Sequence, residues 1–253
     1  VDDENRIPIS AAILANDEYL VNQLIHKDYD VKTPDNIKRT PYMYACIINN
    51  QNWMSNIEQY LSLNDLNAID SQGNSALTFV ANNGLTNVAD HLFIKGVNVN
   101  GINRDNNGII QRYVGILDQY NQILRTARDN RDKSQAFARD IDSRIRDCQG
   151  KIDNISRSIN DLKRKKDQEA QGGGNPRQFD GQIANLENEI RREKGNMDRL
   201  KHEKEKADEA CHIWTRNYNE INNASRETIL YHLDHLDHIS KFLPPPPPPH
   251  HRF

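Results

Sequence analysis

The sequence predicts an all-α protein, in which a short stack of paired helices leads into a long antiparallel two-helix coiled-coil hairpin and then a polyproline tail. Three observations predict this fold class. A motif recurs every 33 to 35 residues in the first hundred residues, heptad spacing of apolar residues covers most of the remainder, and six consecutive prolines stand near the end. We therefore divide the chain into residues 1–108, residues 109–243 with a turn at 171–178, and residues 244–253.

The composition argues against one thick globular core. Only 36% of the 253 residues are hydrophobic, against roughly 45–50% in a typical globular chain. Residues 1–108 carry 7 basic and 13 acidic side chains within a total net charge of -3, and this shallow split does not predict a nucleic-acid partner. No apolar run approaches the about 20 residues that a membrane span needs, so none is expected. Cys46, Cys148 and Cys211 lack metal-ligand or short disulfide spacing, which favours a reducing, cytoplasmic location.

A repeat organises the first hundred residues. Aspartates recur at intervals of 33, 35 and 35 residues, at Asp2, Asp35, Asp70 and Asp105. Six positions after each of the first three, an apolar stretch opens at Pro8, Pro41 and Ala76. A second apolar stretch follows each of these after a polar break, with the i, i+3, i+4 spacing of a helix. Two short helices per period of about 33 residues predict a stacked helical repeat.

The third unit carries a family resemblance. It reads Asp70-Ser-Gln-Gly73-Asn-Ser75-Ala76-Leu77, then Ala81-Asn-Asn-Gly84, and ends in Gly96-Val97-Asn98-Val99-Asn100, and it resembles the ankyrin repeat nearly throughout. The second unit keeps Thr40-Pro41 but has Lys38 where the turn glycine is expected and an irregular middle at residues 51–55. The first unit is degenerate, as expected of a terminal repeat. The resemblance implies an ankyrin-repeat stack over residues 1–108.

The resemblance also implies a function. Ankyrin repeats are protein-binding modules that present turn tips and first helices to a partner, so no catalytic residue, metal ligand or cofactor is expected in them. The expected partner-binding residues are the turn-tip side chains Asn36, Lys38, Arg39, Ser71, Gln72, Asn74, Asn106 and Asn107. Degenerate repeats joined to a coiled coil, in a chain rich in Asn and Ile, are similar to the ankyrin effectors that intracellular bacteria inject into host cells. This similarity implies the host cytoplasm as the location.

Two heptad seams predict the hairpin. The first can be followed from Leu117 to Leu162, and the second from Phe179 to Ile221 with apolar spacing continuing to Leu243. A run of three glycines and a proline separates them at residues 172–176, and helices joined by a short loop pack antiparallel.

The loop fixes an expected register. Counting outward, the numbers of facing residues should sum to about 345, as in coiled-coil pairing, so that Ile145 meets Leu200. The same count places the guanidinium of Arg131 on the ring of Trp214. It keeps Cys148 and Cys211 apart, so that no disulfide is expected.

Motifs for chemistry are few. The glycine run lacks the Lys-Ser/Thr of a phosphate-binding loop. His232, His235 and His238 stand three apart and rotate about 60° per step around a helix, so a polar helix face is favoured over a metal site.

The proline run is the remaining motif. The segment Leu243, Pro244, Pro245, Pro246 and Pro247 resembles the short proline ligands of EVH1 domains, and the whole run resembles profilin and SH3 targets. A rigid spacer is the alternative, because six prolines adopt a stiff polyproline II helix in either role.

These observations predict a non-enzymatic protein–protein interaction adaptor or scaffold that binds a partner through the ankyrin face, with the hairpin and the proline tail as further docking elements. Two alternatives remain open. The chain is a non-catalytic fragment of a larger enzyme, or it is a structural coiled-coil homodimer capped by the repeats.

Overall fold

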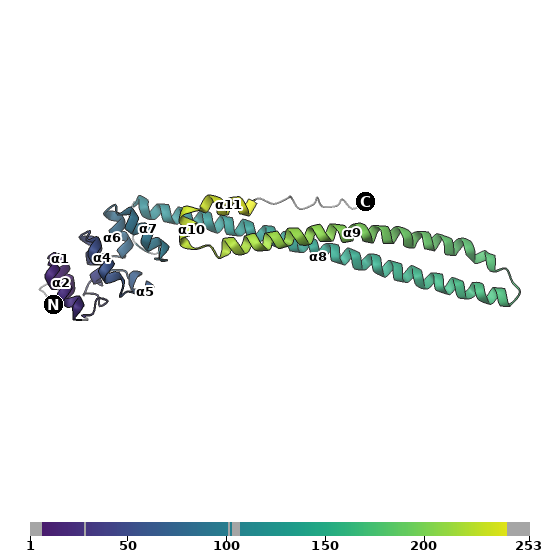
Figure 1. Cartoon of the computed structure of the whole chain (residues 1–253), viewed down its shortest axis with the longest axis horizontal. Helices are drawn as coiled ribbons and strands as arrows, with labels where there is room; N and C mark the ends of the chain where they lie inside the picture. Colours follow the sequence, from purple (N-terminus) through teal and green to yellow (C-terminus); the bar gives the residue numbers. More distant parts are fainter. Residues whose placement is uncertain (1–6, 28, 101, 103–106, 242–253) are drawn as a thin grey trace. The chain divides into compact units, whose positions relative to one another are not determined.

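The computed structural model describes residues 7–27, 29–100, 102 and 107–241 (Figure 1). Among these residues the regular structure is helical, and the only β pairing is an isolated bridge between Ile69 and Ser75. The all-α fold class is therefore confirmed. The chain divides into two compact units, one made of residues 1–122 and 223–237 and the other of residues 123–222 and 238–253.

Three helix pairs form the three repeats of the first unit. They are α1 (Pro8–Leu14) with α2 (Glu18–His26), α3 (Pro41–Ile47) with α4 (Gln51–Glu58), and α6 (Ala76–Asn82) with α7 (Thr86–Ile94). Helices α1 and α3 begin with a proline, which has the φ that a first helical residue needs. The side chains of Thr40 and Ser75 cap α3 and α6 by accepting the backbone N–H three residues on.

The turn inside each pair repeats the same backbone conformation. Asn16, Asn49 and Gly84 have φ of 53°, 59° and 71° between the first and second helices. Only glycine and, less readily, asparagine adopt this left-handed conformation at low cost. The first two repeats therefore have Asn where the third repeat has Gly. This difference explains why the repeat pattern in the sequence is weaker toward the N-terminus.

The second repeat keeps its second helix although its sequence departs from the repeat pattern there. Residues 51–55 form the first part of α4, which Asn50 caps. Trp53, Met54 and Ile57 are buried on one face of this helix. An extra turn of helix, α5 (Leu63–Leu66), follows because Ser62 and Asp65 form a capping box.

The third repeat is covered by two segments from outside the repeats. Helix α8 (Gly108–Gln171) begins against it, with the ring of Tyr113 stacked on that of Phe93 at 4.7 Å between centroids. Helix α10 (Arg226–Tyr231) packs against α7. The Arg226 guanidinium lies 4.9 Å from the centroid of Phe93 and donates a 3.0 Å hydrogen bond to the carbonyl of Val97. Leu230 joins the core of the repeats.

This return of the chain corrects one expectation. Apolar spacing predicted that the second seam continues to Leu243, but α9 (Asp180–Asn222) ends at Asn222 and is followed by α10 and α11 (Leu233–Lys241). Asparagine is a poor helix former, and the Ser225 side chain accepts the N–H of Thr228 to start a new helix. The apolar residues after Ile221 therefore serve a different packing surface.

The second unit contains the antiparallel hairpin of α8 and α9, whose ribbons run side by side in Figure 1. Helix α8 ends at Gln171, Gly173 has a φ of 77° in the loop, and a 3-10 turn, η1 (Pro176–Phe179), precedes α9. Ala138, Ile141 and Leu200 are buried between the helices.

Ion pairs between the two helices show the register of the hairpin. They join Lys151 to Glu193 at 3.8 Å, Lys204 to Asp142 at 3.3 Å, and Lys166 to Asp180. All three agree with the predicted pairing to within one position. Such exposed pairs add little stability, so the register depends chiefly on the buried seam.

One predicted contact of the hairpin is wrong, because Arg131 packs on a different aromatic ring from the one expected. The Arg131 guanidinium lies over the ring of Tyr218, 4.1 Å from its centroid, and not over Trp214. Trp214 is instead buried. Close by in the sequence, Asn217 donates to the carbonyl of Ile239 at 3.0 Å, so the last turn of α11 also packs on the hairpin. The heptad pattern does not predict this packing of a third helix.

Candidate protein-interaction surface

The turn at residues 35–39 is built around one carboxylate. Oδ1 of Asp35 accepts the N–H groups of Ile37 at 3.0 Å and of Arg39 at 2.9 Å, and Oδ2 accepts the Tyr44 hydroxyl. Lys38 has a φ of 63° at the turn position that glycine occupies in the third repeat. The buried Asp35 thus holds the turn in shape while the side chains at its tip face solvent.

The turn at residues 70–74 has the same construction. Oδ1 of Asp70 accepts the N–H groups of Gln72 and Asn74, each at 2.9 Å, and Gly73 has a φ of 79°. Burial acts to raise the pKa of the Asp70 carboxyl, but the hydrogen bonds from the Asn74 N–H and from Arg39 outweigh it and hold the pKa below its ordinary value. Asp70 is therefore ionised at neutral pH.

The two turns are tied to each other. The Ser71 N–H donates to the carbonyl of Ile37 at 2.9 Å. Arg39 donates from Nε to Asp70 at 3.0 Å and from Nη2 to Gln72 at 3.3 Å, and its guanidinium lies 5.4 Å from the centroid of the Phe79 ring. The tips therefore form one connected surface with a fixed backbone.

The structure sorts the predicted partner-binding residues into groups. Asn36, Lys38, Ser71 and Gln72 are exposed at the tips. Arg39 is half-buried between the two turns, where it serves packing. The expectation that Asn74 is an exposed tip residue is wrong. Its relative exposure is 8%, because its side chain turns inward and donates to Asp70 at 3.3 Å.

The predicted residues after the third repeat contribute less. Oδ1 of Asn107 accepts the N–H of Ile109 at 3.0 Å, and its Nδ2 donates to Asn82 at 2.8 Å, so it caps α8. Asn106 and the segment from Leu243 to Pro247 lie outside the described residues.

One tip residue was missed by the sequence reasoning. Ile37 is 38% exposed between Asn36 and Lys38, although it is a large apolar side chain. Exposed apolar residues at a rigid tip are a signal for a binding surface. Its position between two predicted tip residues could have identified it.

A polar network joins the second helices of two repeats. The Glu58 carboxylate accepts from the Tyr42 hydroxyl at 3.2 Å, from His91 Nε2 at 2.8 Å and from Lys95. Burial acts to raise the pKa of Glu58, but the hydrogen bonds from Lys95 and His91 outweigh it and lower the pKa. The His91 side chain is half exposed, with a relative exposure of 52%.

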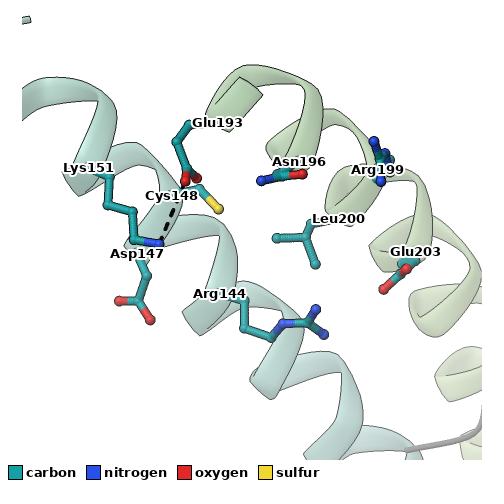
Figure 2. Close-up of a pocket in the computed structure, with 9 residues that line it drawn as sticks. All are labelled: Arg144, Asp147, Cys148, Lys151, Glu193, Asn196, Arg199, Leu200 and Glu203. Atoms are coloured by element: carbon teal, nitrogen blue, oxygen red, sulfur yellow. Dashed lines mark ion pairs between the residues drawn. The ribbon is translucent and has the colours of Figure 1, made fainter. Parts of the chain in front are cut away.

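The hairpin carries a groove of about 430 Å³, which Figure 2 shows in close-up. Three cationic and three anionic side chains line it, so their charges balance: Arg144, Lys151, Arg199, Asp147, Glu193 and Glu203. Cys148 is buried there, and burial together with a hydrogen bond to Glu193 raises the pKa of its thiol. A protonated thiol is a poor nucleophile, so these surroundings do not activate Cys148.

Two further properties concern the described residues alone. Within them, no group of three His, Cys, Asp or Glu side chains has the arrangement of a metal site. None of their helices combines the length and the apolar character that crossing a membrane requires.

The repeated left-handed turns, the paired helices and the aspartate-centred tips together point to one family. Residues 9–103 match the family model for ankyrin repeats (3 copies). These residues are therefore ankyrin repeats, as the resemblance implied. Ankyrin repeats imply protein–protein interaction, and Asn36, Lys38, Ser71 and Gln72 at the tips described above are exposed to solvent. No curated protein matches the chain.

Proposed function

We propose that this protein is a non-enzymatic adaptor or scaffold that binds a partner protein through its ankyrin turn tips. The single observation that supports this proposal is the contrast between backbone and side chains at the tips. Hydrogen bonds to Asp35 and Asp70 fix the backbone of both turns, whereas the side chains of Asn36, Lys38 and Gln72 are exposed. A rigid scaffold that carries exposed, chemically varied side chains binds a partner at low entropic cost.

The proposed contact residues are chosen by this contrast. Asn36, Ile37, Lys38, Ser71 and Gln72 are exposed and form the binding surface. The other three predicted residues that the structure describes are occupied in holding the turns or capping α8. The surface combines one cation, one apolar side chain and several amide or hydroxyl groups, which suits a polar partner surface with an apolar centre.

A quantitative pull-down tests the proposal. The variant with Ile37→Ala, Lys38→Ala and Gln72→Ala removes the central tip side chains without touching Asp35 or Asp70. Proteins captured by the unmodified chain should be lost, and each should bind the purified unmodified chain at least about tenfold more tightly than the variant, as when interface anchors are truncated.

A matched control uses the outer surface of the second repeat. Asn52→Ala with Ser55→Ala changes two exposed side chains of α4, and this variant should retain every partner. Circular dichroism should show the same helicity for all three proteins. Retention of every partner by the tip variant would place the binding surface elsewhere.

The finer parts of the functional prediction are also proposals. Degenerate repeats joined to a coiled coil resemble the ankyrin effectors of intracellular bacteria, and this resemblance supports an effector role in a host cytoplasm. The proline run supports a further interaction with a partner of the EVH1, SH3 or profilin type. Light scattering distinguishes a monomeric scaffold from the homodimer alternative, because a monomer has a mass of 29.2 kDa.

A further inference from the structure

The groove on the hairpin is lined by charges that alternate along each helix. It lies wholly within the second compact unit, between α8 and α9 (Figure 2). Along α8 the order is cation, anion, cation, and along α9, read in the opposite direction, it is anion, cation, anion: Arg144, Asp147 and Lys151 against Glu203, Arg199 and Glu193. Each helix therefore carries the pattern that complements the other helix.

The register of the hairpin places opposite charges of the groove at the same level. The Lys204 ammonium and the Asp142 carboxylate are 3.3 Å apart, which aligns the two helices at this point. Five residues further along α8 and five residues back along α9, Asp147 and Arg199 are level with each other. Neither side chain makes an ion pair or a hydrogen bond with a residue that the structure describes. Their charges are therefore available to groups outside the hairpin.

Two rows of side chains extend this pattern beyond the groove. Residues seven positions apart lie on the same face of a coiled-coil helix. The row of Asp147 on α8 includes the exposed Asp140, and the row of Arg199 on α9 includes the exposed Arg192 and Lys206. Asp140 and Lys206 are level with each other by the same count. We call these rows the acidic row (Asp140 and Asp147) and the basic row (Arg192, Arg199 and Lys206).

A second copy of the chain is the occupant that these rows complement. If a copy is turned by 180° about an axis parallel to the hairpin, its α8 faces α9 of the first copy and every residue keeps its level. Asp147 then faces Arg199 of the second copy. By the same count Arg144 faces Glu203 of the second copy to within one residue. Because the operation is two-fold, each of these contacts forms twice.

The other face-to-face arrangement has unfavourable charges. Turning the copy about an axis across the hairpin would place α8 on α8 and α9 on α9. The basic row would then face the basic row of the second copy, and like charges across an interface repel. The charge pattern therefore selects the arrangement in which the loops of both hairpins lie at the same end.

The groove face also offers some apolar area. Cys148 and Leu200 line the groove. Phe137, seven residues before Arg144, and Ile213, seven residues after Lys206, are partly exposed on the same two helices. An interface that joins such apolar side chains to a charged rim has the usual composition of a protein–protein contact.

We propose that the groove face of the hairpin is an interface between two copies of this chain, in which α8 of each copy packs on α9 of the other as a four-helix bundle. The acidic row of each copy pairs with the basic row of the other. This proposal goes beyond the function proposed for the turn tips and does not depend on it, because no tip residue lies on the hairpin. The dimer carries two sets of tips.

Sedimentation equilibrium of the full chain tests the dimer. At low ionic strength the average mass should rise with concentration from 29.2 kDa toward twice that value. We expect a Kd on the order of 10 µM, as for small interfaces with few apolar contacts. About 1 M NaCl should weaken the dimer at least about tenfold, because it shortens the range of the charge interactions to about 3 Å.

Two charge-reversed variants localise the interface. Asp140→Lys with Asp147→Lys reverses the acidic row, and Arg199→Glu with Lys206→Glu reverses most of the basic row. Each variant alone should self-associate at least about tenfold more weakly than the unmodified chain. An equimolar mixture should recover the Kd to within about threefold, since the two reversed rows face each other and so do the two unchanged rows. Mixing does not alter either hairpin, so this recovery cannot come from repair of a damaged fold.

The matched control makes the same change of charge on another side of α9. Asp198→Lys with Glu205→Lys alters two exposed residues that do not line the groove, and this variant should associate as the unmodified chain does. Circular dichroism should show equal helicity for all four proteins. A mass of 29.2 kDa at every concentration up to about ten times the expected Kd would mean that the face has a different occupant, and would overturn the proposal. So would unchanged association of the variant with the reversed acidic row, or a mixture that stays monomeric.

Discussion

Replacing Arg226 by methionine tests whether the chain returns to the third repeat after α9. The guanidinium donates to the carbonyl of Val97 at 3.0 Å and lies 4.9 Å from the centroid of the Phe93 ring. A hydrogen bond from a charged donor contributes about 1.5–3 kcal/mol, and a cation–π contact contributes about 0.5–2 kcal/mol. Burial of the guanidinium, which lowers the pKa of Arg226, offsets part of this gain.

The net effect should be a loss of about 2 kcal/mol in the free energy of unfolding, because methionine keeps the apolar stem but leaves the carbonyl of Val97 without its donor. For a protein of this size such a loss lowers Tm by about 4–8 °C. Hydrogen exchange followed by mass spectrometry should also show faster exchange in α7 and at residues 97–99, since their cover is loosened.

The control is Arg216→Met, which makes the same chemical change at an exposed position of α9. It should leave Tm within about 1–2 °C of the unmodified value, as most surface substitutions do. If Arg226→Met and Arg216→Met show the same Tm and the same exchange in α7, the packing of α10 on the third repeat is refuted.

Three further predictions follow from single side chains. Lys38→Gly should raise the free energy of unfolding by about 1 kcal/mol in thermal denaturation, because φ is 63° at this position, whereas Gly73→Ala should lower it by a similar amount. Glu58→Gln should destabilise the repeats by about 1–3 kcal/mol at pH 7. Because the pKa of Glu58 is lowered in the folded state, its stabilisation is present above the unfolded pKa of about 4.3 and is lost as pH falls below it, so the Tm difference should shrink toward pH 3. Iodoacetamide should label Cys211 before Cys46 in peptide mass spectrometry, because complete burial raises the pKa of the Cys46 thiol. Equal labelling rates would contradict that burial.

The repeat architecture could be predicted because its signals are local. The spacing of Asp35 and Asp70 reports two turns in which each aspartate accepts backbone N–H groups from residues two and four positions later in the sequence. The register of the hairpin could also be predicted, because a short loop leaves little freedom in how two amphipathic helices align.

The remaining features depend on contacts between distant parts of the sequence. Arg226 and Val97 are 129 residues apart, and nothing near either residue indicates that they meet. Arg39 has the sequence position of a tip residue, but its guanidinium lies between the two turns. It donates a hydrogen bond to Asp70 and lies over the ring of Phe79, both of which belong to the next repeat. Asn74 is a different case, because its partner Asp70 is only four residues away, and the spacing of the turn does not indicate which way the side chain points.

The shared ring of Phe93 has a consequence for the proposed function. Tyr113 of α8 stacks on this ring and Arg226 of α10 lies against it, so the third repeat packs against the helices that follow it and not against a fourth repeat. Helix stacks bind through surfaces that their neighbours leave uncovered. The face of α7 toward α10 is already covered by this chain and is not open to a partner. The proposed binding surface at the turn tips does not overlap with this covered face.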